Sequence, residues 1–210
     1  MKRIIAIVAG GDSSEHDVSM RSAEGIYSFI DKDKYTLYIV ELTKKKWEAL
    51  LPDGSRADGE QVPIDKNDFS FSHDGQKVKP DFAYITIHGT PGENGILQGY
   101  FELLGIPYST CDVLVSAMTF SKFTLNQYLK GFGVRVAESL LVNKRHGISD
   151  QDVIEKIGLP CFIKPNASGS SFGVTKVKTA DQIQPALKEA FAESDDVMIE
   201  AFMDGIELAN

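Results

Sequence analysis

Apolar residues run without interruption over Ile4–Ala9, and the chain becomes polar immediately afterwards. An unbroken apolar run of this length is typical of a strand covered on both faces. It predicts a strand over Arg3–Ala9, and similar runs predict strands over Tyr35–Leu42 and Phe82–His88. Apolar residues at helical spacing predict a helix over Val18–Ile30 between the first two strands. The pattern therefore predicts a β-α-β unit with parallel strands and a right-handed crossover.

The chain beyond residue 50 changes character twice before residue 115. Residues 52–81 are polar and rich in turn signals, Pro52-Asp53-Gly54 and His73-Asp74-Gly75, which indicates a hairpin or a surface excursion. A helix is expected over Gln98–Leu104, where Gly105 follows as a stop signal. On this pattern we expect a first domain over residues 1–115.

Residues 116–210 mix short helical and extended patterns, which favours a small α+β domain. Thr179 and Gln182 form a capping-box pattern, and Pro185 behind them should kink the helix or cost it a hydrogen bond. The expected elements are a helix over Lys122–Lys130, a strand over Glu138–Asn143, a short helix opened by Ser149, strands over Cys161–Lys164 and Gly173–Val177, a helix from Thr179, and a strand over Val197–Phe202.

Composition narrows the class of partner. The 210 residues are 42% hydrophobic and 25% charged, as in ordinary globular proteins, and the net charge is −8. A negative balance argues against a nucleic-acid partner, which requires a basic surface. No segment reaches membrane-spanning length, and the charged residues after Ala9 argue against a signal peptide. We therefore expect a cytoplasmic protein, with Cys111 and Cys161 reduced and mostly buried.

The segment from Gly10 to Ser19 places chemistry after the first strand. Two glycines allow a sharp turn and a close approach to a ligand, and Ser13 and Ser14 are candidate N-caps of the helix. Glu15 and His16 then lie at the carboxyl end of a strand and at a helix N-terminus, where open α/β sheets bind ligands. A plain strand–turn–helix joint with an acidic first turn explains the motif equally well.

A second glycine-rich segment, His88–Gly95, follows the third strand. Its amides could reach an anion, and in a parallel sheet His88 would face the same crevice as Glu15. The alternative is a hydrogen-bonded histidine that ends a strand.

Two lysines of the second half are candidates for phosphate binding. Lys164 ends a strand and precedes the small, hydroxyl-rich loop Ser168–Gly173, whose donors could fold over phosphates. The lysine precedes the glycines, so the segment is not a Walker A loop, and a Gly/Ser turn is the alternative. Lys122 follows Ser121 at a helix start, where a cation is unfavourable unless an anion is nearby. A surface lysine is the alternative there.

Taken together, the motifs occur in a specific order along the whole chain. They are G-G-x-S-x-E-H-x-V-S, H-G-x-x-G-E-x-G-x-x-Q-G, the lone Lys122, K-P-x-x-x-G-S-S-x-G and E-x-x-x-x-G-x-E. In this order they resemble the D-alanine–D-alanine ligase family of the ATP-grasp superfamily. The resemblance implies an α/β protein with a Rossmann-like, parallel-sheet substrate-binding domain over residues 1–115. Residues 116–210 would then form the first α+β subdomain of an ATP-grasp fold, with the second subdomain absent.

The resemblance also implies a reaction and a set of residue roles. ATP phosphorylates the carboxylate of one D-alanine, and the amine of a second D-alanine attacks the acyl phosphate to give the dipeptide used in peptidoglycan synthesis. By family match, Glu15 would hold the first ammonium, His88 would lie near that substrate's carboxylate, and Ser170 would help to fix the substrate. The expected ATP contacts are Lys122, Lys164, Ser168, Gly169 and Ser171 for the phosphates, Glu200, Ala201 and Phe202 for adenine, and Glu207 for the ribose.

The chain departs from the family pattern at Asn210, because the family carries a further C-terminal half. That half would supply the ligands of Mg²⁺, so we expect no metal ligand in these residues and no activity from this fragment, although the parent protein would be an active homodimer. A same-family ligase for D-lactate or D-serine and a non-catalytic nucleotide-binding fragment remain alternatives. A dinucleotide-binding oxidoreductase is disfavoured because Asp12 stands where G-x-G-x-x-G needs its second glycine.

Overall fold

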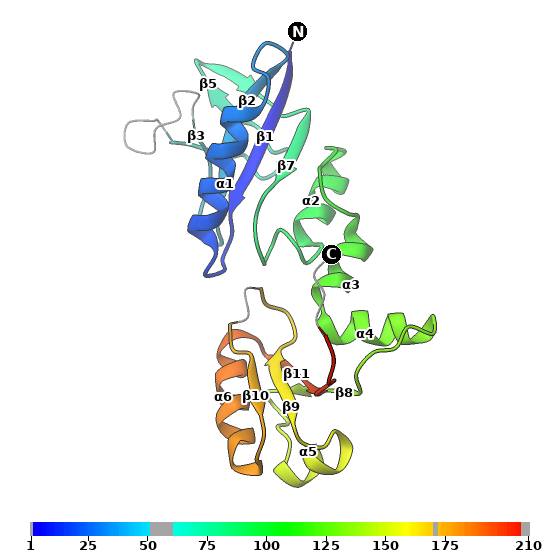
Figure 1. Ribbon diagram of the computed structural model, residues 1–210. Helices are drawn as coiled ribbons and strands as arrows, with labels where there is room; N and C mark the ends of the chain where they lie inside the picture. Colours follow the sequence, from blue (N-terminus) through cyan, green and yellow to red (C-terminus); the bar gives the residue numbers. More distant parts are fainter. Residues whose placement is uncertain (1, 51–60, 170–171, 207–210) are drawn as a thin grey trace. The chain divides into compact units, whose positions relative to one another are not determined.

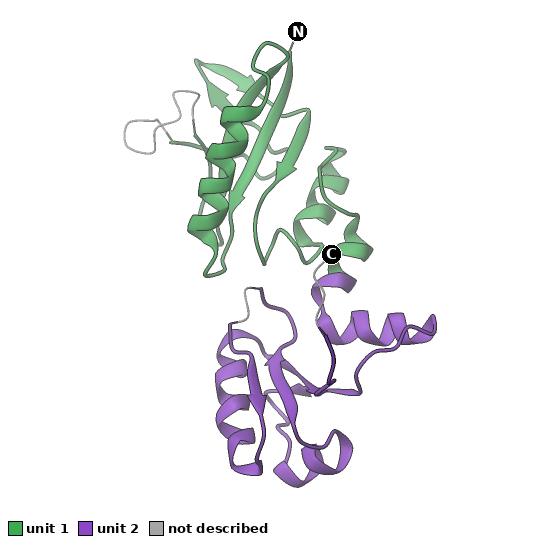
Figure 2. Ribbon diagram, in the orientation of Figure 1, with its two compact units in different colours: residues 1–117 green, residues 118–210 purple. Residues whose placement is uncertain are grey.

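The computed structural model describes residues 2–50, 61–169 and 172–206. The chain divides into two compact units, residues 1–117 and residues 118–210 (Figure 2). This division lies close to the boundary expected after residue 115. The assignment of the units to a substrate-binding domain and an ATP-grasp subdomain stays a prediction.

The first unit is built on a five-stranded sheet with the order β4-β3-β2-β1-β7 (Figure 1). The central strand β1 pairs in parallel with β2 and β7, and α1 lies between β1 and β2 in the chain. The predicted β-α-β unit is therefore confirmed. The antiparallel strands β3 and β4 extend the sheet beyond β2. The bounds are β1 Arg3–Gly10, α1 His16–Phe29, β2 Tyr35–Leu42, β3 Trp47–Leu50, β4 Gln61–Pro63 and β7 Phe82–Ile85.

The unbroken apolar run of β1 reflects burial on both faces. Ile7 and Ala9 pack with Met20 of α1, whereas Ala6 and Val8 belong to a second cluster that includes Phe101. Phe101 lies on α2, which spans Ile96–Leu104 and ends at Gly105 in the left-handed conformation, as predicted. Each face of the strand thus has its own apolar layer.

Several element boundaries differ from the predictions by a few residues, two of them beside the candidate site, and strand β3 and helix α3 were not predicted. Strand β7 stops at Ile85 instead of His88, because the chain leaves the sheet to form the glycine-rich loop. Helix α1 begins at His16 with Glu15 at its N-cap, so neither Ser13 nor Ser14 caps it. Helix α3, Val113–Phe120, has no clear apolar periodicity in sequence.

The predicted hairpin within residues 52–81 is present. Strands β5 (Phe71–His73) and β6 (Gln76–Val78) form an antiparallel pair. Asp74 and Gly75 join them with φ of 51° and 70°, as a tight type I′ turn requires. The earlier turn signal at Pro52-Asp53-Gly54 lies outside the described residues.

The second unit is built on a four-stranded sheet with the order β10-β9-β11-β8 and antiparallel pairings throughout. Its mixture of helices and antiparallel strands matches the predicted α+β class. Helix α6 covers one sheet face, where Ile163, Val197 and Ile199 are fully buried with Ile183 and Leu187. The bounds are α4 Lys122–Gly131, β8 Ser139–Asn143, α5 Asp150–Lys156, β9 Cys161–Pro165, β10 Thr175–Val177, α6 Ile183–Glu193 and β11 Asp196–Ala201.

The start of α6 corrects the expectation for Pro185. A separate 3₁₀ turn over Ala180–Gln182 precedes the helix, so Pro185 is only its third residue. No intrahelical N–H bond is made at that position, and the proline costs neither a bond nor a kink. The Thr179 side chain makes no cap bond, and Gln182 Oε1 instead accepts from the Lys178 amide.

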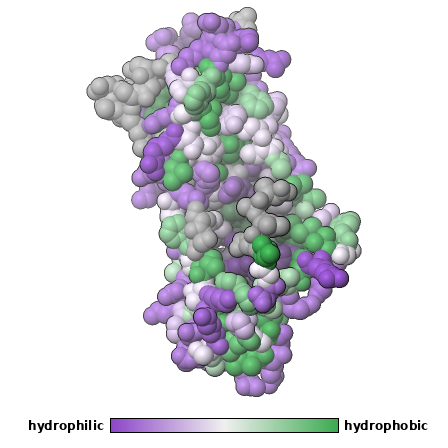
Figure 3. Space-filling view, viewed as in Figure 1, coloured by the Kyte–Doolittle hydropathy of each residue, from purple (hydrophilic) through white to green (hydrophobic). Residues whose placement is uncertain are grey.

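The surface combines apolar and polar residues on the face shown in Figure 3. Within the described part of the chain, no helix has the length and apolarity needed to cross a membrane. Both thiols are free, but only Cys161 is buried; Cys111 is exposed, contrary to expectation, because it lies in the loop before α3.

Candidate functional site

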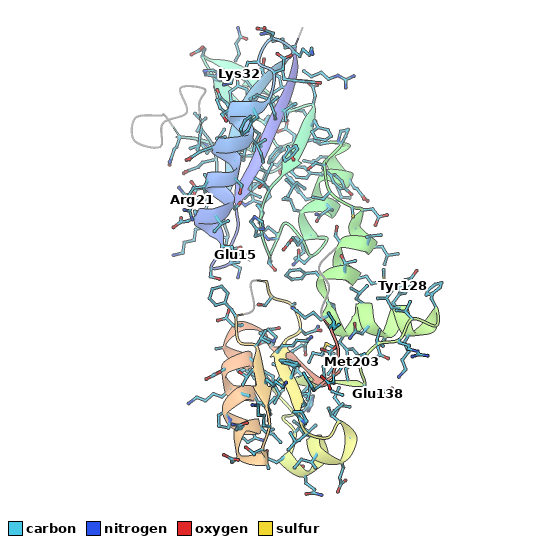
Figure 4. All side chains as sticks on the ribbon, in the orientation of Figure 1. Glu15, Arg21, Lys32, Tyr128, Glu138 and Met203 are labelled. Atoms are coloured by element: carbon cyan, nitrogen blue, oxygen red, sulfur yellow. The ribbon has the colours of Figure 1, made fainter. Side chains whose placement is uncertain are left out.

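The loops that carry Glu15 and His88 are joined to each other. The Ser13 hydroxyl donates to the His88 carbonyl at 2.8 Å, and the Asp12 amide donates to the Thr90 carbonyl at 3.1 Å. These loops follow β1 and β7, which pair in parallel, so their carboxyl ends meet at one edge of the sheet. The structure therefore brings the two predicted substrate-binding segments of the first unit together, with Glu15 at the N-terminal end of α1 (Figure 4).

The glycines before Glu15 are required by close packing. Gly10 and Gly11 have φ of 97° and 92°, a region that L side chains rarely adopt. A Cβ at Gly11 would lie 2.6 Å from Ile87 Cγ2, and one at Gly10 would lie 2.7 Å from the Leu42 carbonyl oxygen. Only glycine allows the backbone to pass between the ends of β2 and β7.

A charged network that sequence reasoning missed supports the same loop. Glu41 is 5% exposed although it lies within the apolar run of β2. Its carboxylate contacts His16 Nε2 at 2.9 Å and Lys46 Nζ at 3.3 Å. Hydrogen bonding to Glu48, together with Glu41, raises the pKa of Lys46. A lone acidic residue inside an apolar strand is the sequence signal that could have revealed this network.

The second sheet has one face outside the apolar core, and this face carries two of the candidate ATP-binding side chains, Lys164 and Glu200. Cross-strand pairing places Lys176, Phe162, Glu200 and Ser139 in one row across β10, β9, β11 and β8. Lys164 lies two residues along β9 and so shares this face. The opposite face, with Ile163 and Ile199, packs against α6.

Lys122 begins α4 and is held close to the loop after β9. Its Nζ donates to the Ser168 carbonyl at 2.6 Å. Asn166, which is 7% exposed, accepts from the Phe123 amide and donates to Ser121 Oγ, so it fastens the helix start to this loop. Burial and the nearby charge of Lys164 hold the pKa of Lys122 below its ordinary value. A partly desolvated cation beside a second cation is suited to receive an anion.

Lys164 and Glu200 form an ion pair that Asn126 completes. Lys164 Nζ donates to Glu200 Oε2 at 2.6 Å, and Asn126 Nδ2 donates to Glu200 Oε1 at 3.0 Å. Sequence reasoning missed Asn126, although it lies four residues after Lys122 and therefore on the same side of α4.

A pocket of about 270 Å³ adjoins this ion pair. Asn126 and Glu200 are its polar lining, and its apolar lining is Val136, Ala137, Phe162, Ala201 and Met203. Phe202 lies beside it, with its ring centroid 6.0 Å from that of Phe162 and Lys176 Nζ 3.3 Å above it. Aromatic and aliphatic walls with a few polar groups are typical of small-molecule sites.

The remaining expected residues divide into three cases. Ser168 and Gly169 lie in the loop that Lys122 contacts. The Ala201 and Phe202 amides donate to the carbonyls of Glu138 and Pro160, so these N–H groups are engaged within the protein. The last case comprises Ser170, Ser171 and Glu207, which lie outside the described residues.

The carboxylates of the described segments do not make a magnesium site. No group of three or more His, Cys, Asp or Glu side chains with metal-binding geometry occurs among them. Glu200, the carboxylate in the pocket, is already bonded to Lys164 and Asn126. The described residues offer cations and an apolar pocket suited to the phosphates and base of a nucleotide, but no carboxylate cluster suited to a metal ion.

Two family models match the chain. The model described as "D-ala D-ala ligase N-terminus" matches residues 4–111, and the one described as "D-ala D-ala ligase C-terminus" matches residues 128–209. Between them they include every candidate site residue except Lys122 and Asn126.

Known proteins agree with these matches. The D-alanine–D-alanine ligase of Phocaeicola vulgatus is 72% identical over 208 residues, which are 99% of this chain and 63% of that protein. D-alanyl-alanine synthetase A from Vibrio cholerae has 32% identity and a TM-score of 0.82, over 97% of this chain and 60% of that one.

Two further solved structures are informative. VanG D-Ala:D-Ser ligase from Enterococcus faecalis has 27% identity and a TM-score of 0.82, over 98% of this chain and 64% of that one. D-alanine–D-alanine ligase from Bacillus anthracis complexed with ATP has 28% identity and a TM-score of 0.70, over 97% and 60%. The chain thus spans about 63% of the length of the Phocaeicola relative. Since a family model matches more than half of it, the chain belongs to the D-alanine–D-alanine ligase family.

Proposed function

We propose that the protein containing this chain is an ATP-dependent D-alanine–D-alanine ligase of peptidoglycan synthesis. The observation that carries the proposal is the pairing of Lys122 and Lys164 beside a pocket with aromatic walls, in a chain of this family. Two clustered lysines, one of them partly desolvated, favour a polyanion. The solved relative complexed with ATP supports a nucleotide as that polyanion.

On this proposal the second unit binds ATP. Lys122 and Lys164 neutralise the phosphates, and the Ser168–Gly169 backbone lies against them. Glu200, Ala201 and Phe202 meet the adenine through their side chains and pocket surfaces. Ser171 for the phosphates and Glu207 for the ribose are proposed from the family resemblance alone.

The first unit receives the first D-alanine. Glu15 pairs with the substrate ammonium, since a carboxylate is the natural partner of that group. His88 lies near the substrate carboxylate, and Ser170 is proposed to fix the same substrate. The hydrogen bond from Ser13 to the His88 carbonyl holds the two loops together. Glu15 and His88 can therefore bind the same D-alanine molecule.

The chemistry that such a site must support is activation of a carboxylate. A carboxylate is a poor electrophile, and phosphorylation gives its carbon a leaving group that the second amine can displace. Positioning of the reactants and neutralisation of transferred charge supply most of the rate enhancement. The Mg²⁺ that the family implies would be held by residues outside those described.

Other proposals concern the second substrate and the fragment itself. The alternative is a ligase of the same family whose second substrate is D-serine or D-lactate instead of D-alanine. The similarity to a D-Ala:D-Ser ligase supports D-serine. We further propose that residues 1–210 alone make no dipeptide and act at most as a nucleotide-binding fragment. Cytoplasmic localisation and a homodimeric parent are proposed on the same family basis.

The test is dipeptide formation from D-alanine and ATP by the longer protein. Lys122→Met should lower activity at least 100-fold, as is usual for loss of a group that stabilises transferred charge. Glu15→Gln should mainly raise the KM of the first D-alanine. Lys188→Met, at an exposed position of α6, is the control and should leave activity unchanged. Residues 1–210 alone should give no dipeptide above a blank. Full activity of Lys122→Met would overturn the proposal.

A further inference from the structure

Glu200 is a polar side chain of the pocket that is held by two hydrogen bonds. Each carboxylate oxygen has its own donor, Lys164 Nζ on Oε2 and Asn126 Nδ2 on Oε1. The side chains of Lys164 and Glu200 are only 21% and 17% exposed. Two donors on opposite oxygens fix the plane of the carboxylate as well as its position.

The two donors play different chemical roles. Lys164 supplies the positive charge that favours the ionised carboxylate, which can then only accept hydrogen bonds. Asn126 adds no charge, and its hydrogen bond serves only to orient the Glu200 carboxylate. It approaches from α4, whereas Lys164 and Glu200 lie on neighbouring strands, so the three groups come from separate elements.

The pocket offers no obvious substitute for Asn126. Ser139 is the cross-strand neighbour of Glu200 on β8, yet its buried hydroxyl has no hydrogen-bond partner among the described residues. The amide of Asn126 is therefore the neutral donor that orients Glu200, while the pocket walls contributed by Phe162 and Ala201 are apolar.

We propose that Asn126 is a positioning residue that aims the Glu200 carboxylate at the amino group of an adenine base in this pocket. Each carboxylate oxygen keeps a second lone pair after its first bond. An exocyclic amine can donate to that lone pair, whereas the carbonyl that guanine carries at the same ring position would oppose it. Asn126 would thus set the preference for ATP over GTP. The inference rests on the proposed function, because it assumes that this pocket takes the nucleotide base.

The test is a titration of the longer protein with ATP and with GTP, followed by NMR. Asn126→Leu should weaken ATP binding about tenfold, the usual cost of losing one hydrogen bond to a charged group. GTP binding should change far less, so the preference for ATP falls. Gln127→Leu makes the same chemical change at the next, exposed position of α4 and should leave both affinities unchanged.

A double-mutant cycle separates positioning from general support of the fold. If Asn126 acts through Glu200, Asn126→Leu should have little further effect in a Glu200→Gln background. The near-isosteric Asn126→Asp, which replaces the donor by a second carboxylate, should lower the ATP preference too, and guards against a packing defect in the leucine variant. Unchanged backbone amide spectra away from the pocket confirm folding.

The outcomes distinguish the two proposals. Equal weakening of ATP and GTP by Asn126→Leu, or additive effects in the cycle, would overturn the role of Asn126 while leaving nucleotide binding intact. Failure of the longer, unmodified protein to bind either nucleotide at millimolar concentration would overturn the proposed function, and this inference with it.

Discussion

Lys122 combines partial burial with the charge of Lys164 nearby, and both effects hold the pKa of Lys122 below its ordinary value. Phosphates bound beside it would raise that pKa again, because an anion favours the charged form. The complex should therefore hold more protons than the free chain in the alkaline window between the two pKa values. Affinity for ATP should fall as pH rises through this window.

This linkage can be measured as proton uptake on ATP binding, from calorimetry in buffers of different ionisation enthalpy. Uptake should be absent near neutral pH, should grow toward alkaline pH, and should disappear in Lys122→Met. Uptake of the same size in that variant would assign the proton to another group.

Gly11 offers a second prediction at the scale of one residue. Gly11→Ala forces a Cβ to within 2.6 Å of Ile87 Cγ2 at a φ of 92°, so it should destabilise the first unit by roughly 1–3 kcal/mol. Gly25→Ala is the matched control, since nothing lies within 4 Å of its Cβ position in α1. That change should stabilise by roughly 0.5–1 kcal/mol. Denaturant unfolding of both variants checks the opposite signs, and equal effects would contradict the packing argument.

Candidate site residues that belong to a local sequence motif could be predicted. The residues that form hydrogen bonds or ion pairs with them from distant parts of the sequence could not. Lys164 was found because it ends a strand before a glycine-rich loop. Asn126 and Glu41 were missed, because each acts on a side chain far away in sequence. Glu41 contacts His16 across 25 positions, and Asn126 contacts Glu200 across 74. Such contacts follow from the register of the sheets and from helix placement, which a single sequence does not specify.

At the scale of elements, the β5–β6 hairpin is held to the preceding turn by Asp68 and Lys77, whose charged atoms lie 2.6 Å apart. Hydrogen bonds from Lys77 and then from Ser70 lower the pKa of Asp68 from 3.8 to about 2. Because the folded pKa is the lower one, the contribution to stability is present above pH 3.8 and is lost as pH falls toward 2.

Asp68→Asn should remove this part of the acid dependence, and Lys77→Met should reduce it through loss of the partner. Lys79→Met, on a neighbouring exposed lysine, should leave it unchanged. The measurement is the free energy of unfolding between pH 2 and pH 5 for each variant. An unaltered slope in Asp68→Asn would show that other carboxylates dominate in this range.

The prediction of helices and strands succeeded where the apolar pattern of the sequence is clear. It failed where tertiary contacts determine the secondary structure. The strands β1 and β2 and the helix α4 were found because long apolar runs and the Ser121–Lys122 start are unambiguous. Helix α3 was missed because Val113–Phe120 is almost uniformly apolar, with only Ser116 buried. Its position depends on packing, since a Cβ at Gly95 would lie 3.3 Å from Ala117 Cβ.

At the scale of the whole molecule, the chain contains separate apolar cores. The clusters around Phe101 and Met20 are formed by residues of the first unit, and the cluster around Ile163 by residues of the second. The two groups of candidate residues follow the same division, with Glu15 and His88 in one unit and Lys122, Lys164 and Glu200 in the other. The residues proposed for substrate binding and those proposed for nucleotide binding thus lie in parts of the chain with separate apolar cores.

This independence predicts that core damage stays within one unit. Ile163 and Phe101 are each 0% exposed. Ile163→Ala should cost roughly 2–5 kcal/mol and Phe101→Ala roughly 3–5 kcal/mol. In hydrogen exchange, Ile163→Ala should speed exchange of protected amides in residues 118–210 and spare residues 1–117, and Phe101→Ala should do the reverse. Leu103→Ala, at a position that is 88% exposed, should change neither. Equal acceleration in both units by either core variant would mean that the chain unfolds as one cooperative body, because two independent cores cannot share the loss.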